Sequence, residues 1–270
     1  MKQIMHVLKM FQLERKVAIV TGGSGLYGEH ISSALGEAGA IVIIASRGLE
    51  KCEQLAQSLQ DQGCQAFARR LDLANEDSIA QFTAEVTAEF GQIDILVNNS
   101  VSRTGLNDIE QTTADGWLRD QQVNGLGTML LTKAIVRTMR ERRTGNIINI
   151  SSIQGILGPH FPVYGDSGMT SGIEYTYTKW GMVGMTKWLA NYYGKFNIRA
   201  NCISPGGYNP VDTEQEIASG EFLQRYIERT PLGRLADEDD IKGAIVYLAS
   251  EASKYVTGHN LILDGGWSSW

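Results

Sequence analysis

Residues 16–28 read KVAIVTGGSGLYG and join a short apolar run to a glycine-rich turn. Valine and isoleucine dominate the run, as expected of a strand buried in a parallel sheet. A helix should start directly after the turn, and its free N–H groups and positive dipole end suit a phosphate. Gly22, Gly25 and Gly28 leave space for a tight turn and for close approach of the backbone to a pyrophosphate. Strand, turn and helix together predict a dinucleotide site, and the turn also contains Ser24, Leu26 and Tyr27, which we expect to line it.

Short apolar runs alternate with helix-length segments along the rest of the chain. This alternation predicts an α/β fold, a single-domain Rossmann-type doubly wound parallel sheet with helices on both faces. We expect residues 1–12 to be an N-terminal extension and residues 13–270 to be that domain. The expected strands contain KVAIV, AIVIIA, QAFARR, IDILVN, NIINIS, IRANCIS and LILD, and the expected helices include 49–61, 76–90, 115–142, 173–193 and 238–249.

Composition and charge favour a small ligand. The chain has 270 residues, 43% of them hydrophobic, and a formal net charge of -6 without a basic cluster. Nucleic acid and anionic membrane are therefore not expected as partners. Cys52, Cys64 and Cys202 are odd in number and lack metal-ligand spacing, so we expect no bound metal and a cytoplasmic protein with reduced thiols. Charged residues interrupt the first ten positions, which argues against a signal peptide or membrane span there.

The end of the second expected strand bears on the type of dinucleotide. An acidic residue at this point would bind the 2′-hydroxyl of NAD, whereas a basic residue accommodates the 2′-phosphate of NADP. The sequence has Ser46 and Arg47 here, and the next acid is Glu50. NADP(H) is therefore favoured over NAD. The alternative is that Arg47 is an ordinary solvated loop residue.

A tyrosine and a lysine in GIEYTYTKWG, residues 172–181, have the spacing of a proton-transfer pair. On a helix, Tyr175 lies over Lys179 because residues four apart share a face, whereas Tyr177 points elsewhere. A nearby ammonium stabilises phenolate and lowers the pKa of a phenol whose usual value is about 10. Tyr175 can then act as a general acid or base.

These features occur in an order that resembles the short-chain dehydrogenase/reductase family. The resemblance extends from about residue 11 to residue 266 and includes TGGSGLYG, ILVNN, VNGLG, NIINISS, YTYTK and CISPGG. It implies an NAD(P)-dependent enzyme that interconverts a carbonyl and an alcohol. By matching motifs it assigns catalysis to Tyr175, Lys179, Ser152 and Asn124, with Ser152 favoured over Ser151. In the family the serine hydrogen-bonds the reacting oxygen and the asparagine orders a water molecule.

The resemblance also implies cofactor contacts beyond the glycine turn. Lys179 would hold the nicotinamide ribose, next to Tyr175. The other cofactor residues matched in this way are Asp72, Leu73, Asn98, Pro205 and Gly206. Members of the family commonly assemble through the helix that carries the tyrosine, so we expect a homotetramer, with a dimer as the alternative.

The segment between Ser152 and Tyr175 is longer than in most compact family members, which indicates an insertion at about 154–173. His160 and Tyr164 within it are candidate substrate ligands, because a polar pocket suits a hydroxyl-rich molecule better than an acyl chain. These polar side chains could instead only stabilise the loop. Residues 209–230 are expected to form a substrate lid.

We therefore expect an enzyme whose small-molecule substrate is a sugar or sugar derivative. A narrower similarity is to reductases of flagellin-modification and nonulosonic-acid pathways. One alternative is a 3-oxoacyl-carrier-protein reductase, which shares the catalytic residues. Another is a non-catalytic NADP-sensing protein.

Overall fold

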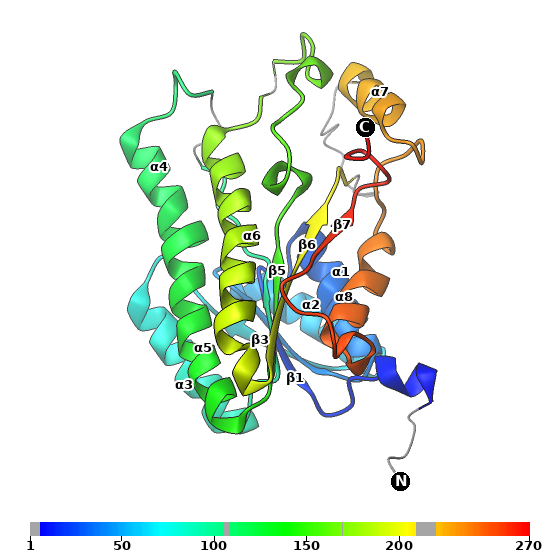
Figure 1. Ribbon diagram of the computed structural model, residues 1–270. Coiled ribbons are helices and arrows are strands. Elements are labelled where there is room, and N and C mark those ends of the chain that lie inside the picture. Colours follow the sequence, from blue (N-terminus) through cyan, green and yellow to red (C-terminus); the bar gives the residue numbers. More distant parts are fainter. Residues whose placement is uncertain (1–5, 105–107, 169, 209–219) are drawn as a thin grey trace.

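A parallel sheet forms the centre of the computed structural model (Figure 1). The structure describes residues 6–104, 108–168, 170–208 and 220–270. Within them the sheet has 7 strands in the order β3-β2-β1-β4-β5-β6-β7. The strands are β1 (Val17–Thr21), β2 (Ile41–Ser46), β3 (Gln65–Arg70), β4 (Ile95–Asn98), β5 (Gly145–Ile150), β6 (Ile198–Pro205) and β7 (Asn260–Leu263).

Helices cover both faces of this sheet. One face carries α1, α2 and α8, and the other carries α3, α5 and α6 (Figure 1). The helices are α1 (Leu26–Glu37), α2 (Leu49–Asp61), α3 (Glu76–Phe90), α4 (Ala114–Gln121), α5 (Thr128–Arg142), α6 (Ile173–Tyr193), α7 (Gly220–Arg229) and α8 (Asp240–Ala249). Short helical turns are η1 (Val7–Phe11), η3 (Ile153–Gly155), η4 (Phe161–Val163), η5 (Gly194–Phe196) and η6 (Glu251–Ser253). The predicted doubly wound α/β fold is confirmed.

Two hydrophobic cores lie on the opposite faces of the sheet. In β1, Val17 and Ile19 belong to the core shared with α3, α5 and α6, whereas Ala18 and Val20 belong to the core shared with α1, α2 and α8. Successive strand residues point to opposite faces, and here both faces are covered. The strand is therefore apolar throughout, with no polar alternation.

Two of the expected helices differ from the sequence-based expectation. The segment expected as one helix over 115–142 contains a π-helical turn, η2 (Gln122–Gly127), between α4 and α5. At its end, Gly127 packs so closely against the Leu73 carbonyl that a side chain would overlap it. The second difference is that α8 begins at Asp240, two residues after the expected start.

The strand order places a potential binding site at the carboxyl ends of β1 and β4. These strands are neighbours, but the chain runs from β1 outward to β2 and β3 before it returns to β4. Loops after β1 and β4 therefore diverge and leave a crevice, as in other open parallel sheets. Among the described helices, none combines the length and apolar character needed to cross a bilayer.

Candidate active site

A cavity of about 430 Å³ occupies this crevice. Its wall is built from the glycine turn, the segments that follow β2 to β6, and the first turns of α6. A second cavity of about 280 Å³ shares Arg103, Ser152, Tyr175 and Gly206 with the first. The two cavities thus meet at the tyrosine that the sequence analysis selects.

Most of the predicted cofactor and catalytic residues lie on the wall of the first cavity. They are Gly22, Gly25, Leu26, Tyr27, Ser46, Arg47, Asp72, Leu73, Ser152, Tyr175, Lys179, Pro205 and Gly206. These residues come from many separate segments of the chain, and parallel strands bring them to one edge of the sheet.

Two predicted glycine-turn residues lie behind the wall. Gly28 packs against the carbonyl of Gly22, where any side chain would overlap it, so it lets α1 approach the turn closely. The hydroxyl of Ser24 lies 3.4 Å from the thiol of Cys52. In this structure both residues support the turn rather than face the cavity.

Asn98 also lies away from the cavity. Its buried amide donates hydrogen bonds to Thr132 Oγ1 at 3.0 Å and to Asn149 Oδ1 at 2.9 Å, which ties β4 to α5 and β5. The next residue, Asn99, lines the cavity and donates to the backbone carbonyl of Gly22 at 3.0 Å. Sequence reasoning selected the first asparagine of the pair, and the alternation of side chains along a strand turns the second one toward the crevice.

Asn124 holds the loop after β4. Its amide accepts from the backbone N–H of Ser102 at 2.7 Å and donates to the carbonyl of Ser102 at 2.9 Å. The loop is fixed further by Asp120, which accepts from the Ser102 hydroxyl at 2.6 Å. Since the next residue is Arg103, these contacts fix the backbone from which the Arg103 side chain extends.

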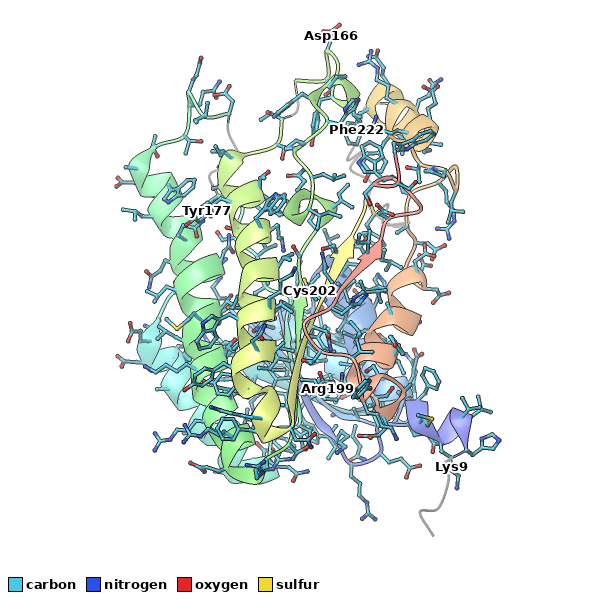
Figure 2. All side chains as sticks on the ribbon, in the orientation of Figure 1. Lys9, Asp166, Tyr177, Arg199, Cys202 and Phe222 are labelled. Carbon is cyan, nitrogen blue, oxygen red and sulfur yellow. The ribbon has the colours of Figure 1, made fainter. Side chains whose placement is uncertain are left out.

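Tyr175 and Lys179 share one face of α6, as predicted. The ammonium Nζ of Lys179 lies 5.4 Å from the centre of the Tyr175 ring. Lys179 is only 3% exposed, and its Nζ donates to the carbonyl of Ile150 at 2.8 Å. Tyr177, labelled in Figure 2, is 60% exposed and packs against Trp117 of α4. It does not line either cavity.

Arg103 is a site residue that sequence reasoning missed. Its Nη2 donates to the Tyr175 hydroxyl at 3.4 Å, and its guanidinium carbon lies 4.8 Å from the centre of the ring. The signal that could have identified it is its place a few residues after β4, on the strand edge where ligands bind. Arg103 is exposed to solvent and lines both cavities.

The charges around Tyr175 favour its ionised form. Burial would raise the pKa of the phenol, but the cations of Lys179 and Arg103 and hydrogen bonds with Ser152 and Arg103 outweigh it, so the pKa is lowered. Burial lowers the pKa of Lys179, and Tyr175 opposes that effect. The arrangement prepares the phenol to release and regain a proton.

The two serines after β5 have different partners. The hydroxyl of Ser151 donates to the carbonyl of Lys179 at 2.8 Å, so its proton is used within the protein. The hydroxyl of Ser152 accepts from the backbone N–H of Gln154 at 3.1 Å, and its own proton is directed to the cavity side, where it hydrogen-bonds the Tyr175 oxygen. Ser152 also lines both cavities, next to Tyr175.

The wall of the first cavity suits a nicotinamide dinucleotide. Gly25 is the N-cap of α1 and places no side chain over the free N–H groups of the first helical turn. Gly22 adopts a φ of 60°, a backbone conformation that side chains disfavour. Arg47 stands at the end of β2, where the adenosine half of a dinucleotide binds in such folds. Among the described residues, no group of three or more His, Cys, Asp or Glu side chains could hold a metal ion.

The expected insertion contributes to the second cavity. Tyr164 lines it and packs against Phe222 of α7, with ring centres 5.4 Å apart. His160 is exposed and lies edge-on to Trp267, beside a small separate cavity of about 40 Å³ that Tyr164 also lines. Of the expected lid over 209–230, α7 is described, and the segment 209–219 lies outside the described residues.

Comparison with known proteins identifies the family of the chain. The family model described as enoyl-(acyl carrier protein) reductase matches residues 24–268. The chain is 31% identical over 257 residues to the 3-oxoacyl-[acyl-carrier-protein] reductase of Aquifex aeolicus, covering 94% of this chain and 98% of that protein. It is 30% identical over 261 residues to the 2-dehydro-3-deoxy-D-gluconate 5-dehydrogenase of Formosa agariphila, covering 95% and 94% of the two chains.

A solved structure of a relative has the same fold. The crystal structure of a gluconate 5-dehydrogenase from Burkholderia cenocepacia, in complex with NADP and tartrate, superposes with a TM-score of 0.88. The two chains are 31% identical, and the superposition covers 98% of this chain and 100% of the other. Fold, ordered motifs and relatives agree, and the chain belongs to the short-chain dehydrogenase/reductase family of NAD(P)-dependent oxidoreductases.

Proposed function

We propose that this enzyme uses NADP(H) to interconvert a carbonyl and a secondary alcohol on a polyhydroxylated acid or a related sugar derivative. The observation that carries the proposal is Arg103, whose exposed guanidinium lies beside the Tyr175 hydroxyl in the cavity. A planar guanidinium binds carboxylates through paired hydrogen bonds. A substrate with a carboxylate would gain both charge pairing and a fixed orientation there.

The activities named for several relatives point to the same class of substrate. They include 2-dehydro-3-deoxy-D-gluconate and gluconate dehydrogenases, and one related structure contains tartrate. All three compounds are hydroxylated carboxylic acids. Acidic sugars of nonulosonic-acid and flagellin-modification pathways, suggested by the narrower sequence resemblance, belong to this class as well.

Proton transfer is assigned to this chain's own residues. A bound nicotinamide supplies or accepts the hydride. Tyr175 donates its proton to the carbonyl oxygen during reduction, and Lys179 and Arg103 stabilise the phenolate that results. Ser152 keeps its proton and donates a hydrogen bond to the same oxygen, where negative charge develops. In alcohol oxidation the proton moves the other way, and Tyr175 acts as the base.

The preference for NADP rests on the end of β2. Arg47 and Ser46 line the cavity there, and the first acidic residue, Glu50, lies in α2. A 2′-phosphate at this point would pair with the guanidinium, whereas the ribose 2′-hydroxyl of NAD would lack the carboxylate that usually binds it.

A homotetramer remains our expectation for the assembly. Several large apolar side chains of α4 to α6 are exposed in the single chain: Leu118, Met129, Trp180, Trp188 and Tyr192. An apolar surface of this kind is typical of a protein–protein interface. Met182, on the same helix as the tryptophans, instead belongs to the buried core. Light scattering checks the expectation, and a monomer at micromolar concentration would contradict it.

The function is tested with a substrate screen on wild type and Tyr175→Phe. Wild type should oxidise hydroxylated acids with NADP⁺, and the variant should lose about 10²–10⁴-fold in turnover while it still binds NADPH. Retained turnover in the variant would refute the role of the tyrosine. Retained NADPH binding shows that the variant is folded. If the wild type binds NADPH but turns over no substrate in the screen, the protein is better described as an NADP sensor.

A second candidate is the reduction of 3-oxoacyl thioesters. It is favoured by the relative from Aquifex aeolicus, which is 31% identical to this chain. Acetoacetyl thioesters added to the same screen separate the two candidates. A kcat/KM for acetoacetyl thioester above that for every hydroxylated acid would select the second.

A further inference from the structure

Gln154 is placed to contact a substrate, although it is outside the catalytic set described above. It lies in the helical turn η3, two residues after Ser152. Its side chain lines the same 280 Å³ cavity as Tyr175 and Arg103. The residue is partly buried and borders the cavity.

The carbonyl end of the Gln154 amide is held by hydroxyl groups. Ser171 Oγ donates to Oε1 at 2.6 Å, and Thr176 Oγ1 donates to the same oxygen at 3.2 Å. These donors fill both acceptor positions of the oxygen. Because the amide is planar, fixing its oxygen also fixes the direction of its two N–H groups.

Tyr164 lies beside this amide. Burial raises the pKa of its phenol, and contacts with Ser171 and Gln154 oppose the rise, so the phenol is neutral at physiological pH. Its ring rests against Phe222 of α7, which limits its movement. The phenol can accept one N–H group of the amide, and the second N–H group remains for a ligand in the cavity.

We infer that Gln154 determines substrate specificity by donating a hydrogen bond to a substrate hydroxyl that does not itself react. The inference rests on the proposed function, since it names a feature of that substrate. The backbone N–H of Gln154 bonds to the Ser152 hydroxyl at 3.1 Å, so the amide extends from a point next to the group that holds the reacting oxygen. The substrate hydroxyl that accepts from the Gln154 amide is therefore on a carbon close to the reacting carbon.

The physical basis is the cost of an unpaired polar group. A substrate without that hydroxyl would leave a fixed N–H group facing it with no acceptor. Sites built to hydrogen-bond a substrate hydroxyl reject analogues that lack it much more strongly than apolar pockets reject a missing methylene. The surrounding hydroxyl groups prevent the amide from turning away.

The test compares matched substrates in wild type and Gln154→Met. The probes are 5-keto-D-gluconate and its 4-deoxy and 6-deoxy analogues, reduced with NADPH. For wild type we expect kcat/KM to be at least about 30-fold higher for the parent than for one analogue, and the variant should reduce that ratio to about 3-fold or less. Ser171→Ala, which keeps the amide but removes one donor to its oxygen, should give an intermediate ratio.

The ratio of kcat/KM between parent and analogue shows whether Gln154 recognises the substrate or only supports the structure. A variant that lowers kcat/KM for parent and analogue by the same factor would show that Gln154 only supports the fold, and the inference would be overturned. Equal wild-type activity on parent and both analogues would overturn it as well while leaving the proposed function intact. Reduction of acetoacetyl thioester alone, with none of the three acids reduced, would reject both the inference and the proposed substrate class. NADPH binding, followed by fluorescence, confirms that each variant is folded.

Discussion

Replacing Arg103 with methionine should weaken the enzyme as a base at neutral pH. The guanidinium donates to the Tyr175 hydroxyl and, with Lys179, lowers the pKa of the phenol. Methionine keeps similar bulk but removes the charge and the hydrogen bond. The phenol then ionises at higher pH, so less phenolate is present to accept the alcohol proton.

The size of the effect follows from the separation of the charges. The guanidinium Nη2 lies 3.4 Å from the Tyr175 oxygen, which carries most of the phenolate charge. Two unit charges at this separation interact by about 1.2 kcal/mol in water and by about 4.9 kcal/mol at an effective dielectric constant of about 20. Because Arg103 is exposed, solvent screens its charge, and we take about 1–2 kcal/mol as the free energy by which it stabilises the phenolate. That free energy corresponds to a loss of about 5- to 30-fold in kcat/KM for oxidation at neutral pH.

The assay is a pH series of kcat/KM for alcohol oxidation, with an uncharged secondary alcohol and with a hydroxylated acid. For the uncharged alcohol, the rise of kcat/KM with pH should move to higher pH in the variant, so that the rates converge in alkali. The acid substrate should show an additional increase in KM. Arg103→Lys, which keeps the charge, is the matched control and should retain most of the wild-type profile.

Superimposable pH profiles of wild type and Arg103→Met on the uncharged alcohol would refute the electrostatic reasoning. A defect confined to KM for the acid would then leave Arg103 a binding residue only. Salt gives an independent check, because ions screen an exposed charge. Raising the salt concentration should lower the wild-type rate toward that of the variant.

Three further predictions concern the cofactor and the fold. Arg47→Ser should lower the preference for NADPH over NADH by about 10- to 100-fold in kcat/KM, and an unchanged ratio would exclude a phosphate contact. Asp94→Ala removes a carboxylate that is 6% exposed and bonded to Arg142 at 2.5 Å, so the free energy of unfolding in urea should fall by about 3 kcal/mol. The control is Arg137→Ala, which breaks the exposed pair of Arg137 with Glu141 and should lower that free energy by under about 0.5 kcal/mol. Gly28→Ala would force the glycine turn open and should weaken NADPH binding about 10-fold or more, whereas Gly184→Ala, which has open space around it, should leave binding unchanged.

Much of the fold could be predicted because its signals are local. Apolar runs of strand length and amphipathic segments of helix length repeat along the chain, and 49–61, 76–90 and 173–193 were predicted with the bounds that the structure has. The π-helical turn at Gln122–Gly127 was not predicted. Gly127, at the end of this turn, packs closely on Leu73. That contact involves a distant segment, and a local pattern carries no information about it.

Some residues of the candidate site could likewise be predicted from local spacing, and others could not. Tyr175 and Lys179 could be paired from the sequence because one helical turn sets their separation. Choosing Asn99 rather than Asn98 for the cavity wall required knowing which face of β4 meets the crevice.

The sequence by itself determined the doubly wound fold, the glycine turn and the Tyr175–Lys179 pair, since each depends on residues close together in the chain. Only the tertiary structure decided that Arg103 joins that pair and that Ser171 and Thr176 fix the amide of Gln154. Arg103 and Tyr175 are 72 positions apart in the chain. Their contact depends on how the crossovers return separate strand ends to one edge of the sheet, and periodicity within a segment carries no information about that distance.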